Sequence, residues 1–254
     1  MKKRFCVSSF LIMFGFLLLI SKIFSIAHNT SYTTASMQQS SALLNAVKTR
    51  GTIYDKNLKP ITNDDYVFIA AVIPCTSSAD ALYKALPQMQ HEELRKKFNS
   101  MMPFTIEVPS DDIYAEGIDI FSVPKLYSEN QCAVHLLGEC DSDSNGVSGI
   151  QKCYDKLLKS FGGFINLRYK TDALHRPLKA APPKTENTIE NSKGGLVLTL
   201  DKKIQIIAEQ AANKIEKGAV VVMDCHTGDI LAAVSRPTFD ILKPEESFEN
   251  KDSP

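Results

Sequence analysis

The sequence predicts an α+β protein that has one N-terminal transmembrane helix, an extended middle domain, and a C-terminal helix followed by a β-hairpin. Three observations support this prediction. An apolar run occupies residues 5–24, and short strand-like and helix-like segments alternate over residues 48–180. Two further apolar runs flank a turn in the stretch GAVVVMDCHTGDILAAVSRPTFD at residues 218–240, which is typical of a hairpin. The polar, proline-containing segment 181–195 predicts a linker between the last two parts.

The first 27 residues predict a membrane anchor. As a helix, residues 5–24 would be about 30 Å long, which is enough to cross the hydrocarbon core. Three basic residues precede the run, so we expect a cytoplasmic N-terminus, with residues 28 onward outside and membrane lipid as a partner. The sequence SIA at residues 25–27 resembles a small-x-small cleavage site, and a cleaved signal peptide is therefore the alternative. We favour the uncleaved anchor because the apolar run is longer than the usual signal-peptide core.

Charge and cysteine content exclude several classes of protein. The 29 basic and 29 acidic residues cancel, which argues against a nucleic-acid partner. Of six cysteines, Cys6 belongs to the predicted anchor, and five remain. The spacing Cys132-x2-His135-x4-Cys140 lacks the fourth ligand of a structural zinc site, and the acidic loop DSDSNG lacks the closing glutamate of a calcium loop. We predict no metal site and no cofactor, and a disulfide among Cys132, Cys140 and Cys153 stays open.

The first half of the middle domain has several local signals. Residues 28–47 are predicted to be a stalk, polar except for the helical patch SALLNAVK. The turn DKN at residues 55–57 separates two apolar runs and predicts a hairpin. Residues 79–102 are rich in helix formers, and Pro87 divides them into two short helices. The segments TIEVP and GIDIFSVPKLY predict short strands.

Two further helices are predicted toward the C-terminus. The first follows the DSDSNG loop, and its apolar face holds Val147, Ile150, Tyr154 and Leu157 or Leu158. The second follows the strand LVLTL, with Asp201 as its N-cap and Gly218 as its stop signal. Its apolar stripe holds Ile204, Ile207, Ala208, Ala211 and Ile215.

Three blocks of sequence resemble one family, the class B penicillin-binding proteins, which are peptidoglycan D,D-transpeptidases of cell-wall synthesis. RGTIYDKN is similar to the opening of that family's pedestal domain, while AVHLLGECDSDSNGVSGIQKCYDKLL and YKTDALHRPL resemble its later His-x-x-Gly and Gly-x-x-Gly-Ile-Glu segments. Residues 196–240 resemble the start of the transpeptidase domain. There are two mild departures, since Lys56 stands where the family usually has arginine and Gln151 where it usually has glutamate.

The resemblance implies a domain order and a place in the cell. We expect a bacterial, single-pass membrane protein whose C-terminal part is extracytoplasmic. The implied parts are a tip and anchor at 1–27, a stalk at 28–47, a pedestal or dimerisation domain at 48–180, a linker at 181–195 and an incomplete transpeptidase domain at 196–254.

The same resemblance implies that catalytic residues are missing from this chain. The family's nucleophile is the serine of an S-x-x-K motif, completed by S-x-N and K-T-G elements. The S-x-x-K match Ser122 to Lys125 contains Pro124, which opposes the helix that the motif requires. We interpret it as a chance match, as we do the S-x-N match Ser128 to Asn130, and K-T-G does not occur. We therefore predict no catalytic residues, and a chain that is inactive on its own.

Three hypotheses about function follow from these patterns. The leading one is a membrane-anchored fragment from a truncated or split gene, whose partners are cell-wall synthesis or division proteins and a separately encoded transpeptidase half. The alternative is a stand-alone membrane-tethered module that binds division or sporulation proteins. A third is an enzyme of another kind that uses Ser122 or the Cys/His set, and we give it the least weight. We expect no partner acid or nucleophile for His226 and therefore predict it to be an exposed turn residue.

Overall fold

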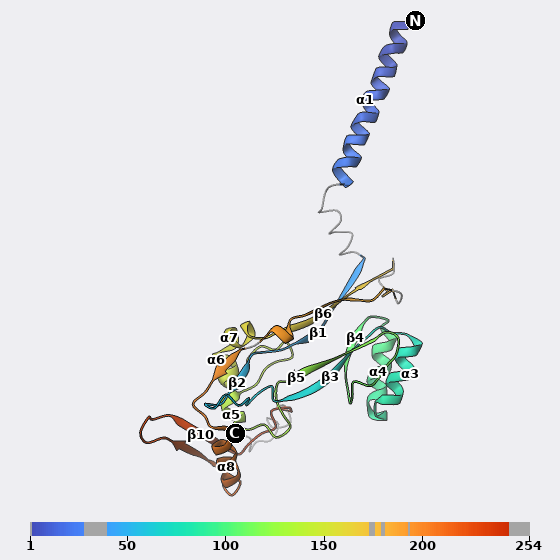
Figure 1. The fold of residues 1–254 in the computed structure, drawn as a ribbon. Helices are drawn as coiled ribbons and strands as arrows, with labels where there is room; N and C mark the ends of the chain where they lie inside the picture. Colours follow the sequence, from blue (N-terminus) through green and yellow to red (C-terminus); the bar gives the residue numbers. More distant parts are fainter. Residues whose placement is uncertain (1, 28–39, 173–175, 179–180, 193, 244–254) are drawn as a thin grey trace.

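The computed structural model describes residues 2–27, 40–172, 176–178, 181–192 and 194–243 (Figure 1). It is a mixed helix and strand structure, as the sequence predicts. The helix α1 (Lys2–Ala27) contains the window Phe10–Ala27, whose length and mean hydropathy of 2.3 suit a membrane span. No residue of this window is buried against the rest of the protein.

A three-stranded antiparallel sheet with two helices on it forms one end of the protein (Figure 1). Its elements are β3 (Asp65–Val72), α3 (Thr76–Ala85), the 3-10 helix η1 (Gln88–Gln90), α4 (His91–Asn99), β4 (Phe104–Val108) and β5 (Ile118–Lys125), in the strand order β4-β3-β5. Leu82 of α3 and Leu94 of α4 are fully buried and pack with the strands. The predicted pair of helices around Pro87 and the two predicted strands are confirmed here.

A second sheet corrects the prediction of a helical patch at SALLNAVK. Its strands are β1 (Ser41–Lys48), β6 (Phe164–Lys170) and β7 (Lys184–Asn187), in the order β1-β6-β7. SALLNAVK is therefore a strand, because Leu44, Ala46 and Val47 pack against the core of β6, and tertiary contacts override a local preference for helix. The strand β7 and the 3-10 helix η2 (Ile189–Asn191) lie in the predicted linker, and the domain boundaries stay predictions.

Short helices in the middle of the chain correct a second prediction. They are α5 (Val134–Leu137), α6 (Gly149–Cys153) and α7 (Asp155–Ser160). The predicted single helix is interrupted at Tyr154, whose backbone leaves the helical region. Its apolar face is only partly as predicted, since Ile150 and Leu158 pack in the core whereas Val147, Tyr154 and Leu157 are exposed. The polar Gln151 is fully buried, which the sequence did not predict.

The C-terminal elements form what we call the helix–hairpin unit, residues 201–236. It consists of α8 (Lys202–Ala212), β9 (Gly218–Met223) and β10 (Ile230–Arg236). The hairpin and the Asp201 cap are confirmed, because β9 pairs antiparallel with β10 and the Asp201 carboxylate accepts from the amides of Lys203 and Ile204. The apolar stripe of α8 is only partly as predicted, because Ile204 and Ala208 pack on the hairpin whereas Ile207, Ala211 and Ile215 are exposed.

The predicted hairpin around residues 55–57 is wrong. The strand β2 (Thr52–Tyr54) pairs in parallel with β8 (Gly195–Val197) rather than with β3. Only one isolated bridge, Tyr54 to Pro60, follows the turn within the described residues. This parallel pairing lies beside the helix–hairpin unit, at the opposite end of the molecule from α3 and α4 (Figure 1).

Candidate functional site: contact of the RGTIYDKN segment with the helix–hairpin unit

Asp55 connects the turn of the RGTIYDKN segment (residues 50–57) to the start of α8. Its side chain is fully buried. Oδ1 accepts from the backbone amides of Asn57 and Lys59, both at 2.8 Å, which closes the turn. Oδ2 accepts at 3.1 Å from the amide of Lys202, the first residue of α8. A carboxylate suits this place, because the first amides of a helix lack partners within the helix and carry partial positive charge.

The pKa of Asp55 reflects this position. Burial by itself raises the pKa, but the hydrogen bonds from the amides of Lys59, Lys202 and Asn57 outweigh it, and the pKa lies below its ordinary value. The carboxylate is therefore ionised at neutral pH, which is the form that accepts all three bonds.

Polar side chains around Asp55 add further links. Asn57 Nδ2 donates to Asp201 Oδ2 at 3.0 Å. Lys202 Nζ donates to Asp64 Oδ2 at 2.6 Å and to the carbonyl of Pro60 at 2.7 Å. Each of these bonds joins residues more than 130 positions apart, so that the turn and the helix hold each other in place.

The strand pair β2–β8 is the apolar part of the same contact. Ile53 of β2 is fully buried and lies opposite Leu196 of β8. There is no space for a side chain at Gly195, where β8 pairs with β2. A Cβ atom at this position would lie 1.7 Å from the carbonyl oxygen of Thr52. Only glycine lets the two backbones approach this closely.

The start of α5 forms a second attachment to the helix–hairpin unit and to Pro237, the residue that follows it. The amide of Ala133 donates to Glu209 Oε1 of α8 at 2.7 Å, and His135 Nε2 lies 2.9 Å from the carbonyl oxygen of Pro237. Ala133 has a positive φ of 57°, which turns its amide toward the glutamate. The unit is therefore held from two directions.

Arg50, the first residue of the RGTIYDKN segment, links this segment to α6, α7 and the loop before them. The Arg50 side chain is only 1% exposed and makes four hydrogen bonds. Nε donates to Gln151 Oε1 at 2.9 Å and Nη2 to the Gln151 carbonyl at 3.1 Å. Nη1 donates to Asp155 Oδ1 at 2.8 Å and to the carbonyl of Ser144 at 2.5 Å. Bonds from Lys159, from the amide of Gly146 and from Arg50 hold the pKa of Asp155 far below its usual range.

The side-chain amide of Gln151 is only partly satisfied by hydrogen bonds in its buried position beside Arg50. Its Oε1 is bonded to Arg50, but its buried Nε2 makes no hydrogen bond of ordinary geometry among the described residues, although the side chains of Gln151 and Tyr127 interact. A buried amide donor without a partner costs about 1–3 kcal/mol. Glutamate would remove this donor and place a second oxygen near the guanidinium.

We predict that Gln151→Glu stabilises the full chain by about 1 kcal/mol at pH 7, because it replaces an unpaired donor with a charge-assisted bond to Arg50. The melting temperature in detergent should rise by roughly 2–4 °C. Since Arg50 lowers the pKa of the new carboxyl on folding, the gain should be present above the unfolded pKa near 4.3 and disappear as the pH falls through the lower folded value. Gln88→Glu, at an exposed glutamine, serves as the control and should change little. A melting temperature that falls at pH 7 would contradict this view of Gln151.

The sequence motifs considered above do not assemble into another site. Ser122 and Lys125 lie in β5, where they pair with Phe68 and Asp65, and residues three apart on a strand point to opposite faces. Cys132 lies in a buried cluster, where burial raises the pKa of its thiol to about 11. His135 is used in the second attachment, and Cys140 Sγ lies 3.8 Å from the hydroxyl of Tyr127. The absence of catalytic residues stays a prediction.

Comparisons with known proteins place the chain in a family context. No family model matches. The chain is 29% identical over 150 residues to the probable peptidoglycan D,D-transpeptidase PenA of Neisseria gonorrhoeae, covering 53% of this chain and 24% of PenA. It is 26% identical over 137 residues to FtsI of Escherichia coli K12, covering 50% of this chain and 22% of FtsI. It is 25% identical over 270 residues to MrdA of Salmonella typhimurium, covering 89% of this chain and 42% of MrdA.

Among solved structures, the penicillin-binding protein PBP2 of Helicobacter pylori matches with a TM-score of 0.47 and 21% identity, over 84% of this chain and 48% of PBP2. PBP2 in its complex with MreC matches with a TM-score of 0.45 and 22% identity, over the same shares of the two chains.

These curated relatives are class B peptidoglycan D,D-transpeptidases, and this chain corresponds to the N-terminal portion of a class B penicillin-binding protein. The resemblance seen in the sequence is confirmed. The chain spans about a quarter of PenA and FtsI.

Proposed function

We propose that this chain is the membrane-anchored scaffold of a peptidoglycan transpeptidase, which tethers and positions the catalytic region without carrying out acyl transfer itself. The observation that carries the proposal is the bridge formed by Asp55, whose carboxylate binds both its own turn and the first amide of α8.

The contacts that hold the helix–hairpin unit suit a protein that supports a catalytic region. The helix–hairpin unit is held by the turn around Asp55, by the parallel strands β2 and β8, and by the Ala133 to Glu209 bond. Three separate links fix both the position and the orientation of α8. A catalytic region built onto this hairpin would thus be held at a set angle to the pedestal.

The proposed lack of acyl-transfer activity rests on the chemistry of the reaction. Attack by serine requires a base beside the hydroxyl and donors for the developing oxyanion. Ser122 lies in a strand whose geometry directs Lys125 to the other face, and the sequence contains no K-T-G. The catalytic serine would belong to a part of the enzyme other than the residues in this chain.

A second candidate is an interaction module for cell-wall synthesis or division proteins. Three large apolar side chains of the helix–hairpin unit favour it, since Ile207 is 64% exposed and Val221 and Met223 are each 60% exposed. Val221 and Met223 lie on the face of β9 turned away from α8, and exposed apolar side chains on an open sheet face can mark a protein contact. A full chain that is monodisperse in detergent would favour the self-sufficient module, and one that aggregates would favour the scaffold whose hairpin other protein covers.

The scaffold proposal requires a defined membrane topology. We expect a periplasm-active reporter fused after residue 180 to be active in cells, because basic residues 2–4 retain the N-terminus in the cytoplasm and the helix carries the rest across. The same reporter fused before residue 1 is the control and should be silent. A silent reporter after residue 180 would overturn the extracytoplasmic placement of the scaffold.

A further inference from the structure

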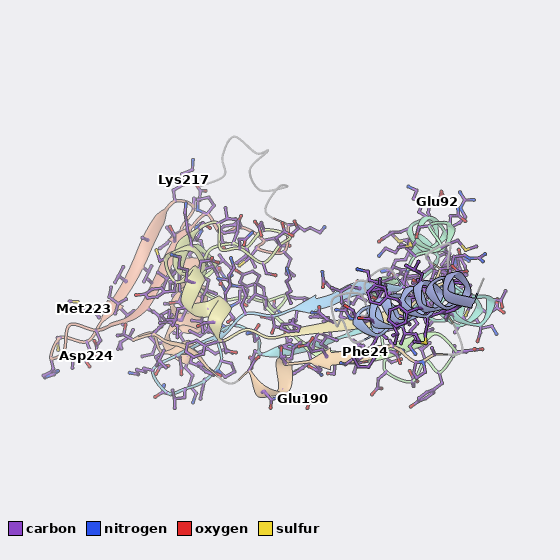
Figure 2. All side chains as sticks on the ribbon, turned by 90° about the horizontal axis from the view of Figure 1, so that it is seen from above. Phe24, Glu92, Glu190, Lys217, Met223 and Asp224 are labelled. Carbon is purple, nitrogen blue, oxygen red and sulfur yellow. The ribbon has the colours of Figure 1, made fainter. Side chains whose placement is uncertain are left out.

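The turn of the β9–β10 hairpin projects from the end of the protein, and Figure 2 shows Asp224 at its tip, beside Met223. The turn is closed by two backbone bonds, from the amide of Asp224 to the carbonyl of Asp229 and from the amide of Gly228 to the carbonyl of Asp224, both at 2.9 Å. Gly228 adopts a φ of +79°, which this tight reversal requires. The backbone of the turn is thus fixed from both strands.

Three side chains with metal-binding atoms are brought together on this turn. Asp224, Cys225 and His226 each offer one such atom, and the three atoms lie within 4.8 Å of one another. Cys225 Sγ lies 3.4 Å from His226 Nδ1, and Asp224 Oδ1 lies 3.5 Å from the same nitrogen. The expectation that no acid or nucleophile accompanies His226 is therefore wrong, although its side chain is exposed as predicted. Asp224 Oδ1 also accepts from the amide of His226 at 2.8 Å, which fixes the carboxylate beside the imidazole.

These separations match those around a tetrahedral metal ion. A zinc ion bound to sulfur at about 2.3 Å and to nitrogen at about 2.0–2.1 Å holds these two atoms roughly 3.5 Å apart. Its nitrogen and carboxylate ligands lie roughly 3.3 Å apart for the same reason. The imidazole nitrogen is therefore at a suitable distance from each of the other two ligands, and those two lie within 4.8 Å of each other.

The ligand types select the class of cation. Thiolate and imidazole favour zinc and related transition metals, whereas magnesium and calcium prefer oxygen ligands alone. The same group of residues also contrasts with Cys132, His135 and Cys140, whose spacing looks more like a metal motif but whose side chains serve other contacts. In the described part of the chain, the turn is the place where three such ligands converge.

We propose that the β9–β10 turn binds a divalent cation of the zinc class through Asp224, Cys225 and His226, with water in the fourth position. Binding replaces the thiol proton, which is released to solvent, and requires the neutral imidazole. The site is distinct from the contact around Asp55, whose carboxylate binds the amide of Lys202, although the charge of Lys56 in the RGTIYDKN segment acts on Asp224.

Cobalt(II) titration of the reduced, untagged full chain in detergent tests the proposal, since this ion reports thiolate binding through a sulfur-to-metal charge-transfer band. We expect the band to appear at one equivalent, to be removed by zinc, and to weaken as the pH falls. Cys225→Ser should abolish the band, and His226→Ala should reduce affinity by roughly tenfold or more. Both variants change exposed turn residues, so their melting temperatures should equal that of the parent chain.

Cys153→Ser is the matched control, because it removes another exposed thiol and should leave the band unchanged. Cys140→Ser addresses the competing motif and should also leave it unchanged. The proposal is overturned if no band appears, if the band persists in Cys225→Ser, or if Cys140→Ser removes it.

Discussion

Replacing Arg50 with alanine is expected to destabilise the full chain by about 3 kcal/mol, which corresponds to a melting temperature lower by roughly 6–12 °C. The substitution removes four hydrogen bonds and leaves both oxygens of Gln151 without their donor inside the protein. Buried acceptors that lose a partner cost about 1–3 kcal/mol each. Thermal unfolding of the detergent-solubilised chain, followed by circular dichroism, measures the effect.

Arg95→Ala is the control for this prediction. Arg95 and its partner Glu92 are 65% and 68% exposed, so removing their ion pair should change the free energy of unfolding by less than about 1 kcal/mol. Arg50→Lys should fall between the two, since an ammonium cannot reproduce the forked geometry of the guanidinium. Equal melting temperatures for Arg50→Ala and Arg95→Ala would show that the Arg50 network does not stabilise the fold.

Replacing Gly195 with alanine is expected to separate the helix–hairpin unit from the RGTIYDKN segment. The added methyl group would overlap the carbonyl oxygen of Thr52, so β2 and β8 must move apart. We expect a local destabilisation of more than about 2 kcal/mol. The methyl group would clash with a backbone atom, which cannot move aside as a flexible side chain can. Hydrogen exchange of amides in β2, β8 and α8 should accelerate by tenfold or more, while β3, β4 and β5 keep their protection.

Val197→Ala provides the comparison within the same strand. Val197 is 52% exposed, and its truncation leaves the backbones of β2 and β8 in contact. Its exchange pattern should resemble that of the parent chain. If Gly195→Ala also left α8 fully protected, the parallel pairing would not be what holds the unit.

Elements specified by local sequence were predicted correctly. Pro87 divides α3 from α4, Asp201 caps α8, and the turn at residues 224–229 joins two apolar strands. Each of these signals acts over a few residues, and for that reason it can be seen without knowledge of the fold.

Elements specified by distant partners were not predicted. SALLNAVK has the composition of a helix, yet it becomes β1 because β6, more than 100 residues later, pairs with it. β2 was expected to pair with β3 but pairs with β8, whose sequence offers no signal for that register. The burial of Gln151 was missed for the same reason, since a polar residue at that position is explained only by Arg50.

The sequence predicted only part of the candidate site. Asp55 was correctly predicted as a turn residue, but its bond to Lys202 spans 147 positions and has no local signal. The resemblance of RGTIYDKN to a family segment pointed to the region, and the contacts of Arg50, Gly195 and Asp55 supply the physical reason.

Incubation of the purified full chain with a fluorescent penicillin tests the proposal that this chain supports a transpeptidase without performing its chemistry. A membrane preparation that contains active penicillin-binding proteins is the positive control. We expect no covalent fluorescent band for this chain, because the S-x-x-K match, Ser122 to Lys125, lies in a strand that directs the two side chains to opposite faces. A band that forms with this chain and is abolished by Ser122→Ala would show that Ser122 is a nucleophile and that the chain is not only a scaffold.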